Sequence, residues 1–284
     1  MDIIKGQAFE GERPLFSIKN RRIENVRIGL GESSLKHASH VSAHDCDFHG
    51  KYPFWHGDDI KITESVFRET ARAAIWYTNA LVMSSCHVQA PKMFRRVSDL
   101  SIENCSFLNA EETLWNCRSV VLDNSEFLNA DYILMNIVDA ELNNCKIQGN
   151  YSFQDGKNIV IRNSIIESKD AFWGTENVTV YDSVIDGEFL GWYSKNLKLI
   201  NCTIRGSQPL YYAENLQLEN CRMEGTDLCF EYSEVQATIT NDIISVRNPK
   251  GGRICAPSIQ QIIFDEHCVN PDACIIETLQ AASA

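Results

Sequence analysis

The chain contains 284 residues, of which 44% are hydrophobic and 23% charged, and its formal net charge at pH 7 is −12. This composition argues against a disordered, collagen-like or coiled-coil chain. Because an acidic surface repels phosphates and anionic lipids, we expect neither nucleic acid nor a membrane as a partner. No apolar run approaches the roughly 18–20 residues that span a bilayer, and residues 1–7 do not resemble a signal peptide, so a cytoplasmic protein is expected.

In chain order, residues 1–20 precede any regular pattern, residues 21–244 follow a repeat of about twenty residues, and residues 245–284 lose it. The repeat is clearest in three copies of the motif Φ-x-Φ-x-Asn-Cys-x-Φ, where Φ is apolar, at 100–107, 197–204 and 216–223. We call the cysteine position the slot. At steps of 19 to 21 residues it is filled by Cys46, Ser65, Cys86, Cys105, Ser125, Cys145, Ser164, Ser183, Cys202, Cys221 and Asp242. Such a period is typical of a solenoid.

Within each repeat, apolar residues stand at alternate positions, as Leu100, Ile102 and Phe107 do around Cys105. This alternation predicts short strands with one buried face. Asn directly precedes the slot in seven copies, and because Asn tolerates left-handed backbone, this position predicts a sharp bend between two strands.

Together these features predict an all-β fold, a single-stranded parallel β-helix of about 11 to 12 coils within one domain, residues 1–284. The regular coils occupy residues 21–244. Residues 1–20 and 245–284 are predicted to cap the open ends, which would otherwise expose core and strand edges.

Eleven cysteines are present, without a Cys-x-x-Cys pair. Six of them share the slot with serine, so a small, packed, buried side chain explains them better than metal or redox chemistry. A metal site formed by Cys255, Cys268, Cys274 and His267 is the alternative at the carboxyl end, but this spacing matches no familiar zinc pattern. We expect no metal and no cofactor.

The sequence resembles the right-handed parallel β-helix proteins of the pectin-lyase-like superfamily, and more closely a bacterial family of single-domain β-helix proteins of uncharacterised function. The similar stretches are GERPLF (11–16), RAAIWYTNA (72–80), YSFQDGKN (151–158), KDAFWGTENVTV (169–180), GEFLGWYSKNLKLINC (187–202), QPLYYAENLQLENC (208–221) and TDLCFEYSEV (226–235). The resemblance implies the right-handed coil but no established activity. The motifs by which pectate lyases bind calcium and abstract a proton are not recognisable.

All five tryptophans stand ten residues before a slot. We call this position the aromatic column; it contains Trp55, Trp76, Arg95, Trp115, Met135, Gln154, Trp173, Trp192, Tyr211 and Tyr232. The residue before each member is generally apolar and suits the core. Because strand side chains alternate between faces, the column is expected to point outward.

Three interpretations of this stripe stay open. The rings could bind saccharides, with or without modifying them, through Trp55, Trp76, Trp115, Trp173, Trp192 and Tyr211. They could form the interface of a non-enzymatic scaffold or homo-oligomer, because Trp and Tyr are enriched in interfaces. They could also stack on one another and only stabilise the coil. Saccharide recognition is the leading hypothesis.

Charged residues beside the column supply a catalytic hypothesis. Glu111 and Asp131 occupy the same outward position in adjacent coils, about 4.8 Å apart. Two carboxylates so close can form the acid–base pair of a glycosidase- or lyase-like enzyme. Arg95, between Trp76 and Trp115 in the column, could bind a uronate carboxylate or stack on both rings. Solvated surface charges explain the same residues, so whether the protein is an enzyme stays open.

Overall fold

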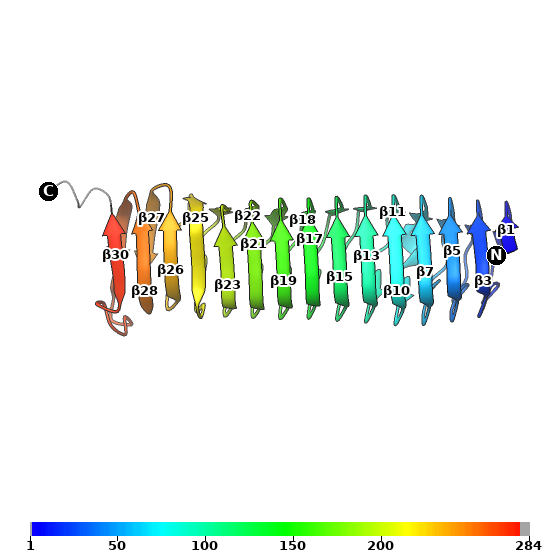
Figure 1. Cartoon of the computed structure of the whole chain (residues 1–284), viewed down its shortest axis with the longest axis horizontal. Coiled ribbons are helices and arrows are strands. Elements are labelled where there is room, and N and C mark those ends of the chain that lie inside the picture. Colours follow the sequence, from blue (N-terminus) through cyan, green and yellow to red (C-terminus); the bar gives the residue numbers. More distant parts are fainter. Residues whose placement is uncertain (1, 279–284) are drawn as a thin grey trace. The chain divides into compact units, whose positions relative to one another are not determined.

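The computed structural model describes residues 2–278, and its regular elements are all β-strands apart from one 3-10 turn. The chain forms two compact units, the N-terminal unit (residues 1–148) and the C-terminal unit (residues 149–284). Within each unit the long strands lie side by side in chain order (Figure 1). A parallel β-solenoid is therefore confirmed, whereas a single domain over residues 1–284 stays a prediction.

The N-terminal unit has one long and one short strand in each turn. The long strands are β1 (Asp2–Lys5), β3 (Lys19–Glu24), β5 (Ser39–His44), β7 (Asp58–Thr63), β10 (Asn79–Ser84), β13 (Ser98–Glu103), β15 (Arg118–Asp123) and β17 (Val138–Asn143). The short strands are β2 (Ala8–Phe9), β4 (Arg27–Ile28), β6 (Asp47–Phe48), β8 (Val66–Phe67), β11 (His87–Val88), β14 (Ser106–Phe107), β16 (Glu126–Phe127) and β18 (Lys146–Gln148). A third pair, β9 (Ile75–Trp76) and β12 (Phe94–Arg95), and the 3-10 turn η1 (Glu69–Ala71) complete the unit. Within the unit, the long strands and the short strands each pair in parallel with their counterparts on adjacent turns.

The C-terminal unit continues the same scheme. Its long strands are β19 (Lys157–Arg162), β21 (Glu176–Tyr181), β23 (Lys195–Ile200), β25 (Leu216–Glu224), β26 (Glu234–Ile239), β28 (Gly251–Ala256) and β30 (Cys274–Thr278). The short strands are β20 (Ile165–Glu167), β22 (Val184–Asp186), β24 (Thr203–Arg205), β27 (Ile243–Arg247) and β29 (Ile259–Ile263). In β25 the long and short strands merge, and its register against β26 shifts between Leu218 and Cys221.

Fifteen long strands make more turns than the 11 to 12 coils predicted. The added turns come from both segments assigned as caps, because β1 pairs with β3 and β28 pairs with both β26 and β30. The predicted number of coils was too low because it counted only repeats that contain the slot pattern. Parallel ladders are built from backbone N–H and C=O groups, so a turn can form without that pattern.

The predicted bend is present. Asn104, Asn124 and Asn144 have φ angles of 53°, 45° and 51°. Asn241 departs from this conformation and holds the Met223 backbone instead, accepting from its N–H at 2.7 Å and donating to its carbonyl at 2.9 Å.

The slot side chain hydrogen-bonds to the backbone beside this bend. The Cys46 N–H donates to Ser65 Oγ one turn on at 3.0 Å, and that hydroxyl donates to the Thr63 carbonyl at 2.8 Å. All eleven cysteines are free thiols, and burial raises the pKa of Cys46 and Cys145 to about 11. Thiols with a raised pKa are poor metal ligands and nucleophiles, which supports the structural interpretation at Cys46 and Cys145.

Candidate functional site

The aromatic column lies at the surface and its members are half-buried. The residues before them, such as Phe54, Phe94 and Phe172, are fully buried in the core. The faces therefore alternate as the strand pattern predicts. The sequence does not specify the orientation of the ring planes.

In the N-terminal unit the column is a stack along the coil axis. The Trp55 and Trp76 rings are nearly parallel, 9° apart, with centroids separated by 5.1 Å. The Arg95 guanidinium carbon lies 4.4 Å from the Trp76 ring centroid and 4.5 Å from that of Trp115. The facing surfaces of these groups cover one another, so the arrangement fits the structural-stacking interpretation.

Hydrogen bonds fix the same rings. Trp55 Nε1 donates to the Ala73 carbonyl at 2.6 Å and Trp76 Nε1 to the Lys92 carbonyl at 2.9 Å, and Trp115 Nε1 bonds to the Tyr132 carbonyl. Their polar atoms are thus occupied by the turn that follows. Saccharide binding by Trp55, Trp76 and Trp115 stays a prediction.

The residues of the catalytic hypothesis lie nearby. Arg95 Nη2 pairs with Glu112 Oε2 at 3.3 Å, and Lys92 Nζ pairs with the other carboxylate oxygen at 3.0 Å. The structure thus pairs Arg95 with Glu112. The sequence pattern singled out Glu111 and Asp131 and not Glu112, which lies one residue after Glu111 in the chain. Glu111 and Asp131 are exposed on consecutive turns, and their catalytic role, like that of Arg95, stays a prediction.

In the C-terminal unit the stack is interrupted. Trp173 lies nearly parallel to Trp192, at 17° and 5.3 Å between centroids. Tyr211, one turn further on, is inclined by 66° to Trp192 at 5.8 Å, and Tyr232 is inclined by 62° to Tyr211. Trp192 therefore has a parallel ring from one neighbouring turn and an edge-on ring from the other.

A surface hollow of about 210 Å³ lies at this interruption. Its lining consists of Phe189, Trp192, Gln208 and Tyr211. The walls are mainly aromatic, with the Gln208 amide as a polar group. Trp192 Nε1 is shielded from solvent and has no hydrogen-bond partner within the described chain, in contrast to the indole groups of Trp55 and Trp76.

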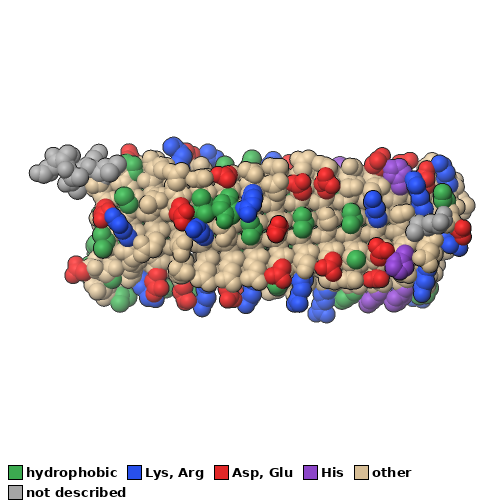
Figure 2. Space-filling view, in the orientation of Figure 1, with side chains coloured by type: hydrophobic (Ala, Val, Ile, Leu, Met, Phe, Trp, Pro, Cys, Tyr) green, Lys and Arg blue, Asp and Glu red, His purple; other side chains and the backbone are tan. Residues whose placement is uncertain are grey.

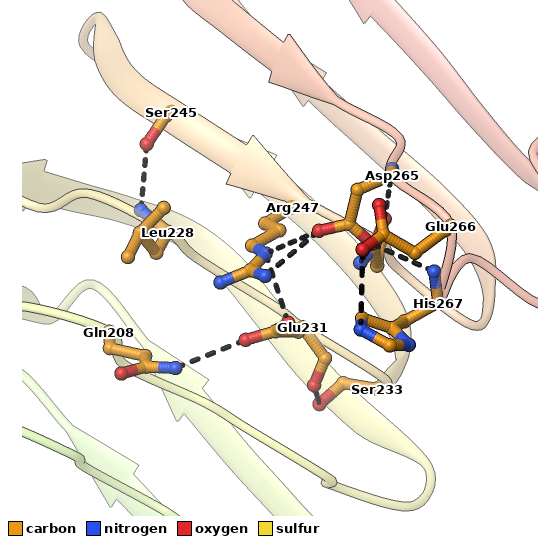
Figure 3. A network of polar contacts seen from close by, with 10 residues as sticks. Gln208, Leu228, Glu231, Ser233, Ser245, Arg247, Asp265, Glu266 and His267 are labelled. Carbon is orange, nitrogen blue, oxygen red and sulfur yellow. Dashed lines mark hydrogen bonds and ion pairs between the residues drawn. The ribbon is translucent and has the colours of Figure 1, made fainter.

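A polar network lies behind the hollow (Figure 3). Gln208 Nε2 donates to Glu231 Oε2 at 3.0 Å, and Arg247 Nε lies 3.1 Å from Glu231 Oε1. Arg247 also pairs with Asp265 at 2.8 Å. The Glu231 side chain is only 3% exposed. By the spacing of the sequence, Glu231 occupies the position directly before the aromatic column, where core residues such as Phe172 stand. This acidic residue in an otherwise apolar position is the sequence signal that could have identified the network.

The network and burial alter two acid–base equilibria. Hydrogen bonds from the Asn248 amide, the His267 N–H and Arg247 lower the pKa of Asp265 to about 2. Burial, and next the Glu231 charge, raise the pKa of Tyr211. The Tyr211 hydroxyl therefore stays protonated, and it can both donate and accept a hydrogen bond.

Two further hollows lie over the long strands of the same unit. One, of about 280 Å³, is bordered by Asn177, Asn196 and Asn215, whose amides bond from turn to turn at 2.8 Å. Another, of about 430 Å³, adjoins the register shift of β25. Figure 2 shows charged side chains of both signs scattered over the face that the long strands form.

No helix within residues 2–278 is long and apolar enough to cross a membrane. Over the same range, no group of three or more His, Cys, Asp or Glu side chains is placed to hold a metal ion.

Comparisons with known proteins agree with the fold. A family model described as "Protein of unknown function (DUF3737)" matches residues 2–277. No curated protein matches the sequence. A solved structure of the alginate lyase AlyF-OU02 with G6 has 10% identity and a TM-score of 0.58, covering 100% of this chain and 88% of its own. PfbA, a surface adhesin of Streptococcus pneumoniae, has 8% identity and a TM-score of 0.42, with coverage of 91% and 84%. At 10% identity the likeness to the alginate lyase concerns the β-helix fold alone.

Proposed function

We propose that this chain, which belongs to the DUF3737 family, binds saccharides at a surface hollow. The hollow is the one lined by Phe189, Trp192, Gln208 and Tyr211. The observation that carries the proposal is the interruption of the aromatic stack at Trp192. There, aromatic walls and an amide border a concave surface instead of covering one another.

Saccharide chemistry suits this surface. A sugar ring has apolar C–H groups that pack on aromatic side chains, and hydroxyl groups that bond to amides and to the Tyr211 hydroxyl. The hollow of about 210 Å³ is smaller than the roughly 300–1,000 Å³ of pockets for drug-sized molecules. It accordingly suits one ring of a saccharide.

The similar structure of an alginate lyase with G6 supports saccharides as the first ligands to examine. Because that likeness shows only the fold, binding rests on the hollow, and no reaction is transferred to this chain.

The test is calorimetric titration of the full chain with neutral and acidic oligosaccharides. We expect the parent to bind at least one of them and Trp192→Ala to weaken binding by about tenfold or more, because the variant loses an aromatic wall. Trp76→Ala, from the same column but with both faces covered, is the matched control and should retain the affinity. Failure of every saccharide to bind the folded parent would refute the proposal.

Self-association is the second candidate, because Tyr193 and Tyr212 stack at 5.0 Å between centroids while remaining 49% and 37% exposed. Sedimentation equilibrium tests this function. An oligomeric parent that dissociates in Tyr193→Ser would support self-association. A monomeric mass for both the parent and the variant favours the saccharide function.

A further inference from the structure

We infer that the hollow selects a neutral sugar ring over a uronate, and that Gln208 is the residue that sets this preference. The inference rests on the saccharide binding proposed above and specifies its ligand class. It is carried by three features: the orientation of the Gln208 amide, the burial of Glu231 and the charge of the network that Glu231 joins.

The orientation of the Gln208 amide is dictated by its partner. Glu231 is a carboxylate and can only accept hydrogen bonds, so the amide nitrogen of Gln208 must face it, as the 3.0 Å contact shows. The amide oxygen is then the atom left for a ligand. It accepts a bond from a sugar hydroxyl, whereas an ionised carboxylate has no proton to donate.

The network behind Gln208 has an excess of negative charge. One guanidinium, that of Arg247, pairs with both Glu231 and Asp265. Glu231 is 3% exposed, so water screens its charge weakly. The Glu231 charge is also, after burial, the second cause of the raised pKa of Tyr211, which lines the hollow. A uronate carboxylate would therefore be repelled.

Other charges near the hollow do not reverse this sign. Lys169 Nζ lies 5.3 Å from the Phe189 ring centroid, but Lys169 is exposed, so solvent and salt reduce its attraction for an anion. Asp227 adds negative charge on the Gln208 side, where its carboxylate accepts from Ser207 Oγ at 2.6 Å and its backbone carbonyl accepts from the Gln208 N–H at 3.0 Å.

The experiment compares ligands that differ only at C6. β-1,4-Linked mannooligosaccharides carry a hydroxymethyl group where mannuronate oligosaccharides of the same length carry a carboxylate. Calorimetric titration of the full chain at low salt should give about tenfold or tighter binding of the neutral series. Equal or tighter binding of the mannuronates would overturn the inference while leaving saccharide binding intact. If neither series binds and no other sugar binds, both the inference and the proposed saccharide binding are refuted.

Two variants assign the preference to Gln208. Gln208→Lys gives Glu231 a cationic partner and adds positive charge beside the hollow, so it should shift the preference toward the uronate by about tenfold. Gln217→Lys makes the same change on β25, outside the lining, and should leave the preference unaltered. Circular dichroism and the melting temperature establish that both variants fold. An unaltered preference in folded Gln208→Lys would overturn the role of Gln208.

Discussion

The bend before each slot has backbone groups inside the coil that need hydrogen-bond partners. At Cys105 the thiol accepts from the Cys86 N–H at 3.4 Å and donates to the Glu103 carbonyl at 3.2 Å. Ser125, one turn on, accepts from the Cys105 N–H and donates to the Asp123 carbonyl in the same way. A small side chain that both donates and accepts is needed, which explains why both cysteine and serine occupy the slot.

Replacing Cys105 by valine should lower the free energy of unfolding by about 1–3 kcal/mol, because it leaves a buried N–H and a carbonyl without their side-chain partner. Cys105→Ser should come within about 1 kcal/mol of the parent, since the hydroxyl can replace both bonds. Urea unfolding of both variants measures the difference. Equal stability of the two would contradict the hydrogen-bonding account of the slot.

At the scale of elements, the aromatic column has different roles in its parts. Around β9 and β12 the planar side chains cover one another and their indole N–H groups bond to the backbone. Beside β23 and β24, Tyr211 is turned edge-on to Trp192 and a hollow opens. A single column of the repeat thus yields both a stabilising stack and a candidate binding surface.

The stacked part predicts a stability effect at Arg95. Arg95→Ala removes a group held between two tryptophan rings and should lower the free energy of unfolding by about 1–2 kcal/mol. Arg96→Ala is the matched control, because Arg96 is exposed and lies 6.0 Å from the centroid of one ring, that of Tyr77. Urea unfolding compares the two variants; a smaller loss at Arg95 than at Arg96 would contradict the stack.

The sequence predicts what the repeat imposes on every turn. Three features recur with the repeat of 19 to 21 residues: the slot, the bend at Asn104 and the buried position of Phe94. Their placement follows from strand alternation. Ring orientation is set by side-chain torsions and by neighbouring turns. The spacing of the repeat therefore does not predict that Tyr211 lies edge-on to Trp192. The partners of Glu231 were missed because Arg247 and Asp265 lie where the period has ended.

At the scale of the whole molecule, each described turn inside a unit pairs with the turn before and the turn after it. In the N-terminal unit, Asp58, Asn79 and Ser98 occupy one register position on β7, β10 and β13. Stability in such an array is approximately a sum over turns and their shared interfaces. Within each unit, the described strands therefore take their ladder partners from adjacent turns.

The number of turns can therefore change by whole units. Removing residues 79–97 would place Ser98 against Asp58 and bring Trp115 next to Trp76, with the inward side chains still inward. We expect this shortened protein to keep a β-rich circular dichroism spectrum and a cooperative melt. Removing residues 79–88 takes out β10 and β11 but leaves the rest of their turn, and it should unfold or aggregate. If both deletions fail alike, the turns are not interchangeable modules; if the first folds, a gene encoding this chain could gain or lose length one repeat at a time.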